Sequence, residues 1–260
     1  YDYTKECLQK LKAAKVNVGM VQIGNETTGS ISGESRWENK AKLFSAGSAA
    51  TRQISEEYEH PILVSIHFTN PERSGNYASQ ARNLSNYGVD YDIFASSWYP
   101  FWHGTLENLT NVLTNIHETY GKKVMVAETS YAYTSEDTDF YGNTIGEGGG
   151  IVKDYPFTVQ GQANLVRAVI DTVVNKTTNG IGVFYWEGTW ISAGGASWEE
   201  NSALWEKNGS GWASSYAAEY DPEDAGQWYG GCAVDNQAFF TAAGKATEAL
   251  KVFALVRGSD

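Results

Sequence analysis

The chain has 260 residues, enough for one large domain or two small ones. Its formal net charge of −12 argues against nucleic acid or an anionic membrane surface as a partner. No apolar run approaches the roughly 18 residues of a membrane-spanning helix. The 9 tryptophans and 16 tyrosines fit either an aromatic core or flat surfaces that bind sugar rings. The two cysteines, Cys7 and Cys232, are predicted to form no disulfide.

Apolar residues alternate between the spacing of helices and that of short buried strands along the whole chain. Helices are predicted at 7–14, 37–54, 78–84, 106–120, 159–173 and 246–256, and strands at 16–23, 62–68, 91–96, 123–128 and 181–186. Gly121 is the expected C-terminal cap of the fourth helix. Long loops are expected at 129–156 and 187–235. Strands that alternate with helices predict an α/β fold with a parallel sheet covered on both faces.

Two of the predicted strands end in a glutamate. Glu26 follows the apolar run 21–23, and Glu128 follows the apolar run 124–127. An ionised carboxylate is costly inside a buried strand, whereas at a strand end it can face a cavity and titrate. Because parallel strands gather their ligand sites at their carboxyl ends, we expect these two groups to lie close together. Such a pair supplies the proton donor and the nucleophile or base of glycoside hydrolysis. The alternative is that each glutamate is a surface residue of a loop.

Further polar and aromatic residues follow strand ends and are predicted to bind substrate. They are Asn25, His67, Trp98, Tyr99, Trp102 and Trp186. The tryptophans are expected to stack on sugar rings, with core packing as the alternative. His67 is expected to contact substrate, although a structural histidine would have the same sequence signature.

The strand-end segments also carry a specific resemblance. They read VQIGNE at 21–26, HFTNP at 67–71, SWYPFW at 97–102, VAETS at 126–130 and GVFYWE at 182–187, and GWASSY follows at 211–216. Together they resemble the arabinogalactan endo-β-1,4-galactanases, glycoside hydrolase family 53, over nearly the whole chain. The resemblance implies a (β/α)8 TIM barrel that cleaves the galactan side chains of pectin with retention of configuration. It further implies Glu26 as acid/base, Glu128 as nucleophile and Asn25 as the residue that binds the sugar 2-hydroxyl.

The chain departs from the family's pattern in the position of its acid/base residue. In the family this glutamate ends the fourth of eight strands, whereas Glu26 ends the first strand predicted here. We therefore expect residues 1–260 to be a single catalytic-domain portion with strands four to eight. The expected partners are the polysaccharide and a missing N-terminal barrel portion, and we expect impaired activity without that portion. No signal peptide opens the sequence, although the resemblance implies a secreted protein.

Two other functions remain open from the sequence. One is a different retaining β-glycanase of the same clan, such as a mannanase or a xylanase. The other is a non-catalytic, carbohydrate-binding remnant that keeps the tryptophan faces and tolerates loss of either glutamate. The presence of both glutamates favours an enzyme.

The predicted loop 129–156 contains a candidate calcium site. Asp137, Asp139 and Asn143 place oxygen atoms at alternating positions, as calcium-binding loops do. The alternative from the spacing alone is a solvated acidic loop. The resemblance to bacterial galactanases implies a structural Ca2+ that joins this loop to a later one. Its implied ligands are the side chains of Asp137, Asp139 and Asn143, the carbonyl of Tyr141, and Cys232 and Asp235 of the later loop.

Overall fold

A computed structural model describes residues 1–146, 155–208, 214–219, 221–223, 225–227 and 231–255, so part of the 211–216 segment lies outside the described residues. The chain forms two compact units. Unit 1 comprises residues 1–129 and 168–185, and unit 2 comprises residues 130–167 and 186–260. The expectation of a single catalytic domain stays a prediction. Among the described residues, no helix combines the length and the apolar character needed to cross a membrane.

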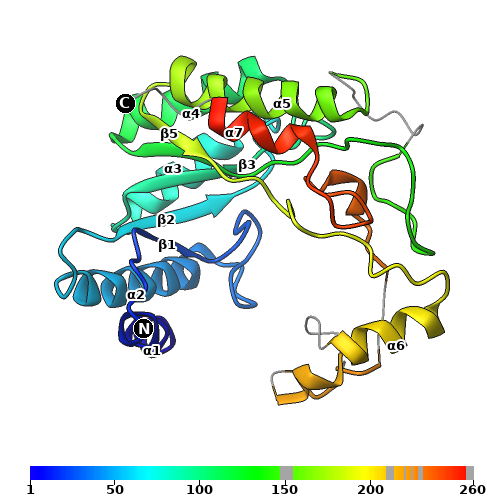
Figure 1. The fold of residues 1–260 in the computed structure, drawn as a ribbon. Coiled ribbons are helices and arrows are strands. Elements are labelled where there is room, and N and C mark those ends of the chain that lie inside the picture. The colour runs from blue at the N-terminus through cyan, green and yellow to red at the C-terminus, as the bar shows by residue number, and fades with distance from the viewer. Residues whose placement is uncertain (147–154, 209–213, 220, 224, 228–230, 256–260) are drawn as a thin grey trace. The chain divides into compact units, whose positions relative to one another are not determined.

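Unit 1 is built on a five-stranded sheet, which confirms the predicted number of strands (Figure 1). The strands are β1 (Met20–Ile23), β2 (Leu63–Phe68), β3 (Ile93–Ser97), β4 (Lys123–Glu128) and β5 (Gly180–Val183). Their order in the sheet follows the sequence, and every neighbouring pair is parallel. All five strands therefore present their carboxyl ends at the same edge, as the argument from the sequence required.

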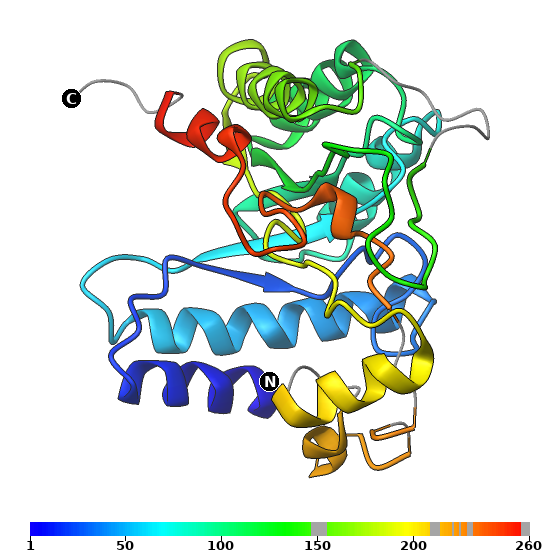
Figure 2. The ribbon, with the colours of Figure 1, turned by 45° about the vertical axis from the view of Figure 1, so that its right-hand side comes forward.

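One helix precedes β1, and further helices connect the strands of the sheet. They are α1 (Asp2–Ala13), α2 (Trp37–Ser55), α3 (Asn76–Asn86), α4 (Leu106–Tyr120) and α5 (Val159–Asp171), the last followed by a π-helical turn, η1 (Thr172–Lys176). Helix α1 packs against α2, and the two lie side by side in Figure 2, while α3 packs against α4. Gly121 ends α4 in the left-handed conformation, and its N–H donates to His117 O at 2.7 Å, which confirms the predicted cap.

The alternation of side chains along the strands separates two faces of the sheet. On one face Val64, Ile66 and Phe68 are buried, and the Phe68 ring stacks on that of Phe94 at 4.9 Å. On the other face Ile93 and Ala95 pack with residues of the adjacent strands. Because side chains alternate with a period of two, His67 and Ser97 lie on this second face. His67 and Ser97 are thus polar residues near the carboxyl ends of β2 and β3, on a face that also contains the apolar residues Ile93 and Ala95.

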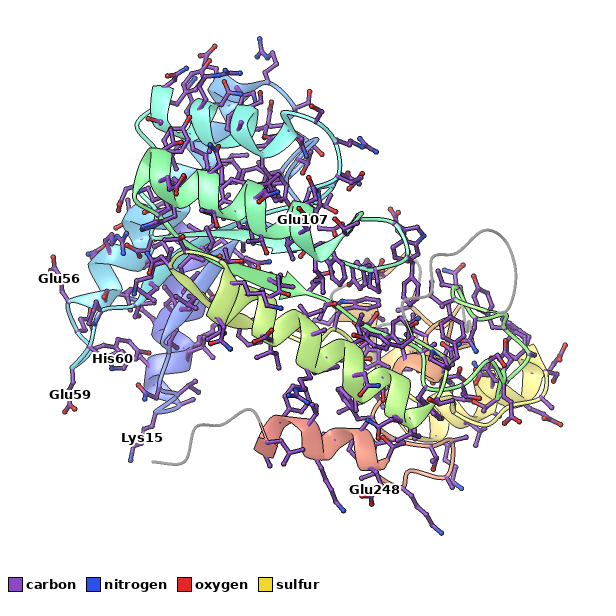
Figure 3. All side chains as sticks on the ribbon, turned by 90° about the horizontal axis from the view of Figure 1, so that it is seen from above. Lys15, Glu56, Glu59, His60, Glu107 and Glu248 are labelled. Carbon is purple, nitrogen blue, oxygen red and sulfur yellow. The ribbon has the colours of Figure 1, made fainter. Side chains whose placement is uncertain are left out.

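The turns that enter the strands lie away from that edge. Figure 3 shows Lys15, Glu56, Glu59 and His60 at the end of unit 1 where β1 and β2 begin, and Glu107, at the start of α4, toward the other end. His60 Nε2 lies 3.1 Å from Val18 O, so this histidine belongs to the entry end of the sheet. Glu107 is an exposed residue of the connection after β3.

Unit 2 contains a helix that the sequence analysis placed within a loop. Helix α6 (Trp198–Asn208) and a 3-10 turn, η2 (Ser215–Glu219), interrupt the long loop predicted at 187–235. Ser197 Oγ accepts the Glu200 N–H at 3.3 Å, and Glu200 Oε2 accepts the Ala196 N–H at 3.0 Å. This reciprocal pattern is close to a capping box, and its Ser-x-x-Glu signature was readable in the sequence. Two 3-10 turns, η3 (Asp235–Gln237) and η4 (Glu248–Lys251), and a short helix, α7 (Val252–Leu255), follow. Within the described residues, the helix predicted at 246–256 thus consists of η4 and α7.

Candidate active site

Glu26 lies in the turn that follows β1. The chain reverses at Gly24, where φ is 77° and a Cβ would lie 2.5 Å from Thr27 Cγ2, so a side chain does not fit there. Glu26 itself has a φ of 46°, a left-handed conformation that is uncommon for residues other than glycine. Its backbone N–H donates to His67 Nδ1 at 3.3 Å. The carboxyl group therefore projects from a turn whose backbone is fixed on the end of β2.

Several hydrogen bonds fasten this turn to its surroundings. The backbone N–H and the hydroxyl of Thr27 both donate to His67 O at 2.8 Å. Thr69 N donates to Thr28 Oγ1 at 2.9 Å. The buried ammonium group of Lys40 donates to the carbonyl groups of Thr27 at 2.7 Å and Thr28 at 3.2 Å. With its donors and acceptors paired, the turn holds the Glu26 backbone in an otherwise unfavourable conformation.

Glu128 ends β4, beside the end of β3. The register between these strands shifts between Ser96 and Ser97, so that Ser97 is the partner of Glu128. Irregularities of this kind redirect side chains and are frequent next to active sites. The Tyr99 hydroxyl donates to Glu128 Oε2 at 2.8 Å. Tyr99, which was predicted at this edge, therefore orients the second carboxyl group.

The two carboxyl groups and His67 converge on one point. An oxygen of Glu26, a ring nitrogen of His67 and an oxygen of Glu128 all lie within 4.8 Å of one another. The Ser97 hydroxyl donates to Glu26 Oε1 at 2.6 Å, and His67 Nε2 lies 2.8 Å from Ser97 Oγ. The side-chain oxygen of Asn25, Oδ1, lies 3.0 Å from His67 Nδ1. Glu26, Glu128, Asn25 and His67 are thus brought together, as expected from their positions at strand ends.

His67 is a neutral group inside this cluster. Its side chain is fully buried, and burial lowers the pKa of the imidazole to about 4, although the nearby Glu26 carboxylate raises it. Both ring nitrogens contact protein groups, Nδ1 the Glu26 N–H and the Asn25 amide, and Nε2 the Ser97 hydroxyl. These contacts indicate that His67 organises the neighbouring groups, and its predicted contact with substrate stays a prediction.

Burial raises the pKa of the Glu128 carboxyl group above its ordinary value. The hydrogen bond from Tyr99 acts in the opposite direction because it stabilises the ionised form, and the charge of Glu26 raises the pKa further. The Glu128 side chain keeps 15% of its surface exposed, so reagents can reach it. Glu128 is therefore a partly desolvated carboxyl group, and the hydrogen bond from Tyr99 stabilises its ionised form.

The aromatic residues of the SWYPFW segment divide into buried and exposed groups. Trp102 is 51% exposed, and its ring centroid lies 5.6 Å from that of Tyr99, so it offers a free face next to the cluster. Trp98 has no exposed surface. The prediction that Trp98 stacks on a sugar is therefore wrong in this structure, because a fully buried indole has no face that a ligand can reach.

Comparisons with known proteins agree with this geometry. The sequence pattern of glycosyl hydrolase family 53 matches residues 1–253. The chain belongs to glycosyl hydrolase family 53. Over 254 residues it is 57% identical to the endo-beta-1,4-galactanase of Bacillus subtilis (strain 168), an alignment that covers 97% of this chain and 58% of the relative.

Two further relatives extend the comparison within family 53. The arabinogalactan endo-beta-1,4-galactanase of Cellvibrio japonicus (strain Ueda107) is 32% identical over 218 residues, which are 78% of this chain and 57% of the relative. The GH53 catalytic domain of Ignisphaera aggregans superposes with a TM-score of 0.75 at 29% identity, and the match covers 99% of this chain and 64% of that one. The fold is thus of the α/β, (β/α)8 barrel type, and the chain spans 58% and 57% of the length of the two galactanase relatives.

One residue that contacts the candidate site lay outside the predicted set. Ser97 bonds directly to Glu26, yet it was not predicted as a site residue. A signal was available, because Ser97 lies two residues after Ala95 on β3 and so shares the face of His67. Trp186, predicted as a substrate-binding residue, is the first residue of unit 2 after β5 and is partly buried, with its ring centroid 6.3 Å from that of Trp190.

The predicted calcium ligands of this family 53 chain lie in unit 2, on two loops that contact each other. Cys232 N donates to Asp139 Oδ2 at 2.8 Å, and Thr138 N donates to Asp235 Oδ2 at 3.3 Å. Two oxygen atoms of the predicted set, Asn143 Oδ1 and Asp235 Oδ1, are buried without a hydrogen-bond partner. Such atoms are expected where a cation is bound, since a buried acceptor otherwise needs a donor. The two loops are thus joined by hydrogen bonds, and their oxygen atoms are of the type that calcium prefers, whereas the calcium ion itself stays a prediction.

Two members of the predicted set fit calcium only through their backbone. Burial raises the pKa of the Cys232 thiol to about 11, so the sulfur stays protonated and is a poor ligand. The Tyr141 side chain is 48% exposed, and the prediction concerns its carbonyl group. Within the described residues, a group of three or more acidic, histidine or cysteine ligand atoms within 4.8 Å occurs only at Glu26, His67 and Glu128. The loop carboxylates would therefore have to move closer together to bind one ion.

Proposed function

We propose that the polypeptide that contains this chain is an endo-acting, retaining β-1,4-galactanase that cleaves (arabino)galactan, with Glu26 as acid/base and Glu128 as nucleophile. The observation that carries the proposal is the convergence of these two carboxyl groups within 4.8 Å. Retaining glycosidases hold their carboxyl groups about 5–5.5 Å apart, whereas inverting ones need about 6.5–9.5 Å to admit a water molecule. The relatives that carry the name galactanase supply the substrate class.

In the first step, Glu128 attacks the anomeric carbon while Glu26 gives its proton to the glycosidic oxygen, and the carbon–oxygen bond to the leaving chain breaks. Tyr99 holds Glu128 Oε2, which leaves Oε1 to form the galactosyl ester. In the second step, Glu26 removes a proton from water, the water oxygen attacks the same carbon, and the ester bond to Glu128 breaks. Two inversions give net retention. Asn25 and the exposed face of Trp102 are proposed to bind the sugar, as is Trp186.

The first experiment compares polysaccharides. The purified polypeptide is expected to release short β-1,4-linked galacto-oligosaccharides from galactan and nothing from mannan or xylan. Products from mannan or xylan would favour another β-glycanase of the clan, and binding of galactan without cleavage would favour the carbohydrate-binding alternative. In the described residues β1 and β5 each pair with one strand, so the proposed barrel needs further strands between them. The 260-residue chain is accordingly expected to be less active alone than with the remaining barrel segments.

A change at Tyr99 tests the proposed nucleophile. Tyr99→Phe removes the hydroxyl that stabilises ionised Glu128, so the Glu128 carboxyl group stays protonated to a higher pH. The acid limb of the kcat/KM profile is therefore expected to move to higher pH, and the rate below neutral pH is expected to fall. Tyr87→Phe, at an exposed tyrosine, is the control and should leave the profile unchanged. An acid limb that does not move in Tyr99→Phe would contradict the assigned role of Glu128.

We also propose that Asp137, Asp139, Asn143 and Asp235, with the carbonyl groups of Tyr141 and Cys232, bind a structural calcium ion. Calcium at a hundredfold excess over its Kd should stabilise the fold by about 2.7 kcal/mol, because it binds the folded state only. A chelator is expected to lower Tm, and Asp137→Ala should abolish that response. Glu136→Gln, an exposed neighbour outside the set, should retain it. A Tm that responds neither to calcium nor to the chelator would exclude the site.

We propose an extracellular location, because a polysaccharide substrate does not enter cells. The charge of −12 is compatible with this location, since it disfavours adhesion to anionic surfaces.

A further inference from the structure

We infer that Ser97 is a positioning residue for Glu26: its hydroxyl, oriented by His67, holds one carboxyl oxygen of Glu26 so that the other oxygen faces the bond to be cleaved. This inference rests on the proposed role of Glu26 as acid/base. It adds a specific function for two residues, Ser97 and His67, that do not themselves exchange a proton with the substrate.

The geometry is a chain of short contacts. Ser97 Oγ donates to Glu26 Oε1 at 2.6 Å, and His67 Nε2 lies 2.8 Å from Ser97 Oγ. The side chains of Ser97 and His67 have no exposed surface. Water therefore does not compete for these contacts, and a hydrogen bond in such a place fixes its partners more firmly than one at the surface. Glu26, by contrast, is only partly buried, so its second oxygen remains accessible.

The protons of this chain have one consistent arrangement. A serine hydroxyl has a single proton, and here that proton goes to Glu26 Oε1. The Ser97 oxygen then accepts a hydrogen bond from His67 Nε2–H, so the neutral imidazole carries its hydrogen on Nε2. Nδ1 is left as an acceptor, and the Glu26 N–H donates to it at 3.3 Å. Asn25 Oδ1 lies 3.0 Å from the same nitrogen, so this arrangement requires the Asn25 amide to be turned with its NH2 group toward the ring. His67 thus accepts a hydrogen bond from the Glu26 backbone N–H at Nδ1. Its Nε2–H donates to Ser97, and the Ser97 hydroxyl in turn donates to the Glu26 carboxyl group.

This arrangement suits a group that must both give and take a proton. Glu26 can lose and regain its proton at Oε2 while Oε1 continues to accept the hydrogen bond from Ser97. The hydrogen bonds from His67 to Ser97 and from Ser97 to Glu26 therefore keep the same donors and acceptors in both steps. The hydrogen bond is stronger when Glu26 is ionised, because a charged acceptor strengthens it. Ser97 therefore limits rotation of the Glu26 carboxyl group in both steps.

Other ionisable groups surround Glu26 and must be considered in any pH experiment. Glu128 and His67 lie within 4.8 Å of it, and His103 and Tyr77 interact with its charge from a greater distance. None of these four contacts Ser97 Oγ except His67, within the described residues. A substitution at Ser97 thus changes one contact of Glu26 and leaves its electrostatic neighbours in place.

The adjacent serine offers a matched control. Ser96 is equally buried, but it points to the opposite face of β3, where its hydroxyl lies 2.5 Å from the Tyr77 hydroxyl and donates to the backbone carbonyl of Ser97 at 2.9 Å. Ser96→Ala removes a buried hydroxyl from the same strand without touching either carboxyl group. It controls for the loss of stability that accompanies an unsatisfied or missing buried hydrogen bond.

The experiment measures kcat, KM and their pH dependence for Ser97→Ala, Ser97→Cys and Ser96→Ala in the polypeptide that contains residues 1–260. Ser97→Ala is expected to lower kcat on galactan by about 30- to 100-fold, since a misplaced catalytic group costs rates of this order. KM should change little because Ser97 does not reach substrate. Ser97→Cys, a weaker donor of similar volume, should give intermediate values, and Ser96→Ala should match the parent.

The dependence on the leaving group separates positioning from general damage. With an aryl galactoside whose leaving group needs no proton, Ser97→Ala should lose much less activity than it loses on galactan. Equal losses on both substrates would overturn the inference. If Glu26→Ala cleaves galactan at the parent rate, the proposed function itself fails, and that result is distinct from a failure of the Ser97 variants alone.

A spectroscopic measurement needs no turnover. In 15N spectra of histidine-labelled protein above pH 6, His67 is expected to be neutral with its hydrogen on Nε2, and Ser97→Ala should shift its ring signals while Ser96→Ala should not. The four histidines of the chain allow assignment by single substitutions. A His67 that carries its hydrogen on Nδ1 in the parent would overturn the inference.

Discussion

Glu128→Ala is expected to lower kcat on galactan by about four to six orders of magnitude, as the loss of a catalytic nucleophile does in other hydrolases. The carboxyl group lies within 4.8 Å of that of Glu26, and Tyr99 orients it, so a substituted residue at this position leaves the anomeric carbon without an attacking group. The measurement is the steady-state rate at which new reducing ends appear on galactan whose own reducing ends have been chemically reduced. Glu107→Ala, an exposed glutamate of unit 1 at the start of α4, is the control and should be as active as the parent (Figure 3).

Azide distinguishes loss of the nucleophile from loss of folding in Glu128→Ala. The small anion can occupy the space of the missing carboxylate and attack an activated aryl β-galactoside from the same side. The expected product is the α-galactosyl azide, in which the configuration is inverted once. Formation of the β-azide, or wild-type-like turnover without azide, would show that Glu128 is not the nucleophile.

Glu26→Ala is expected to lower kcat on galactan by about two to four orders of magnitude, the range that general acid–base catalysis contributes. The loss should be smaller for an aryl galactoside with a good leaving group, because its departure needs no proton. The galactosyl ester on Glu128 should then accumulate, since Glu26 is absent as the base that activates water. A burst of aryl alcohol, followed by slow turnover, measures this accumulation.

Azide gives the opposite stereochemistry in Glu26→Ala. It attacks the ester formed on Glu128 and should release the β-galactosyl azide after two inversions. The two alanine variants thus provide controls for each other, with an α product from one and a β product from the other. The same product from both variants would contradict the assignment of two different roles.

The sequence predicted the sheet well because its signals are local. Each strand is an apolar run between helices, and five of these runs became the five parallel strands. The boundaries were less accurate: β1 begins at Met20 although the apolar pattern begins at residue 16. Apolar side chains before Met20 do not by themselves create strand pairing, which depends on the register with β2. Helix α6 was not predicted because its mainly polar sequence has no clear apolar spacing, although its capping residues signal the start of a helix.

The sequence located the carboxyl groups of the site better than their partners. Glu26 and Glu128 were predictable, since a glutamate at the end of an apolar strand is conspicuous. The bond between Ser97 and Glu26 was not predicted, because it joins the ends of two strands, β1 and β3, that are not neighbours in the sheet. Burial also decided between alternatives that a sequence leaves open, since Trp98 is enclosed whereas Trp102 is half exposed.

The φ of 46° at Glu26 has a consequence for the history of such chains. A left-handed residue other than glycine costs about 1–2 kcal/mol, so Glu26→Gly should relax the turn and raise the free energy of unfolding even as it removes the carboxyl group. Selection for hydrolytic activity and selection for a stable fold therefore favour different residues at position 26. A lineage released from the need to degrade polysaccharide would be expected to drift toward glycine or asparagine here sooner than at Glu128.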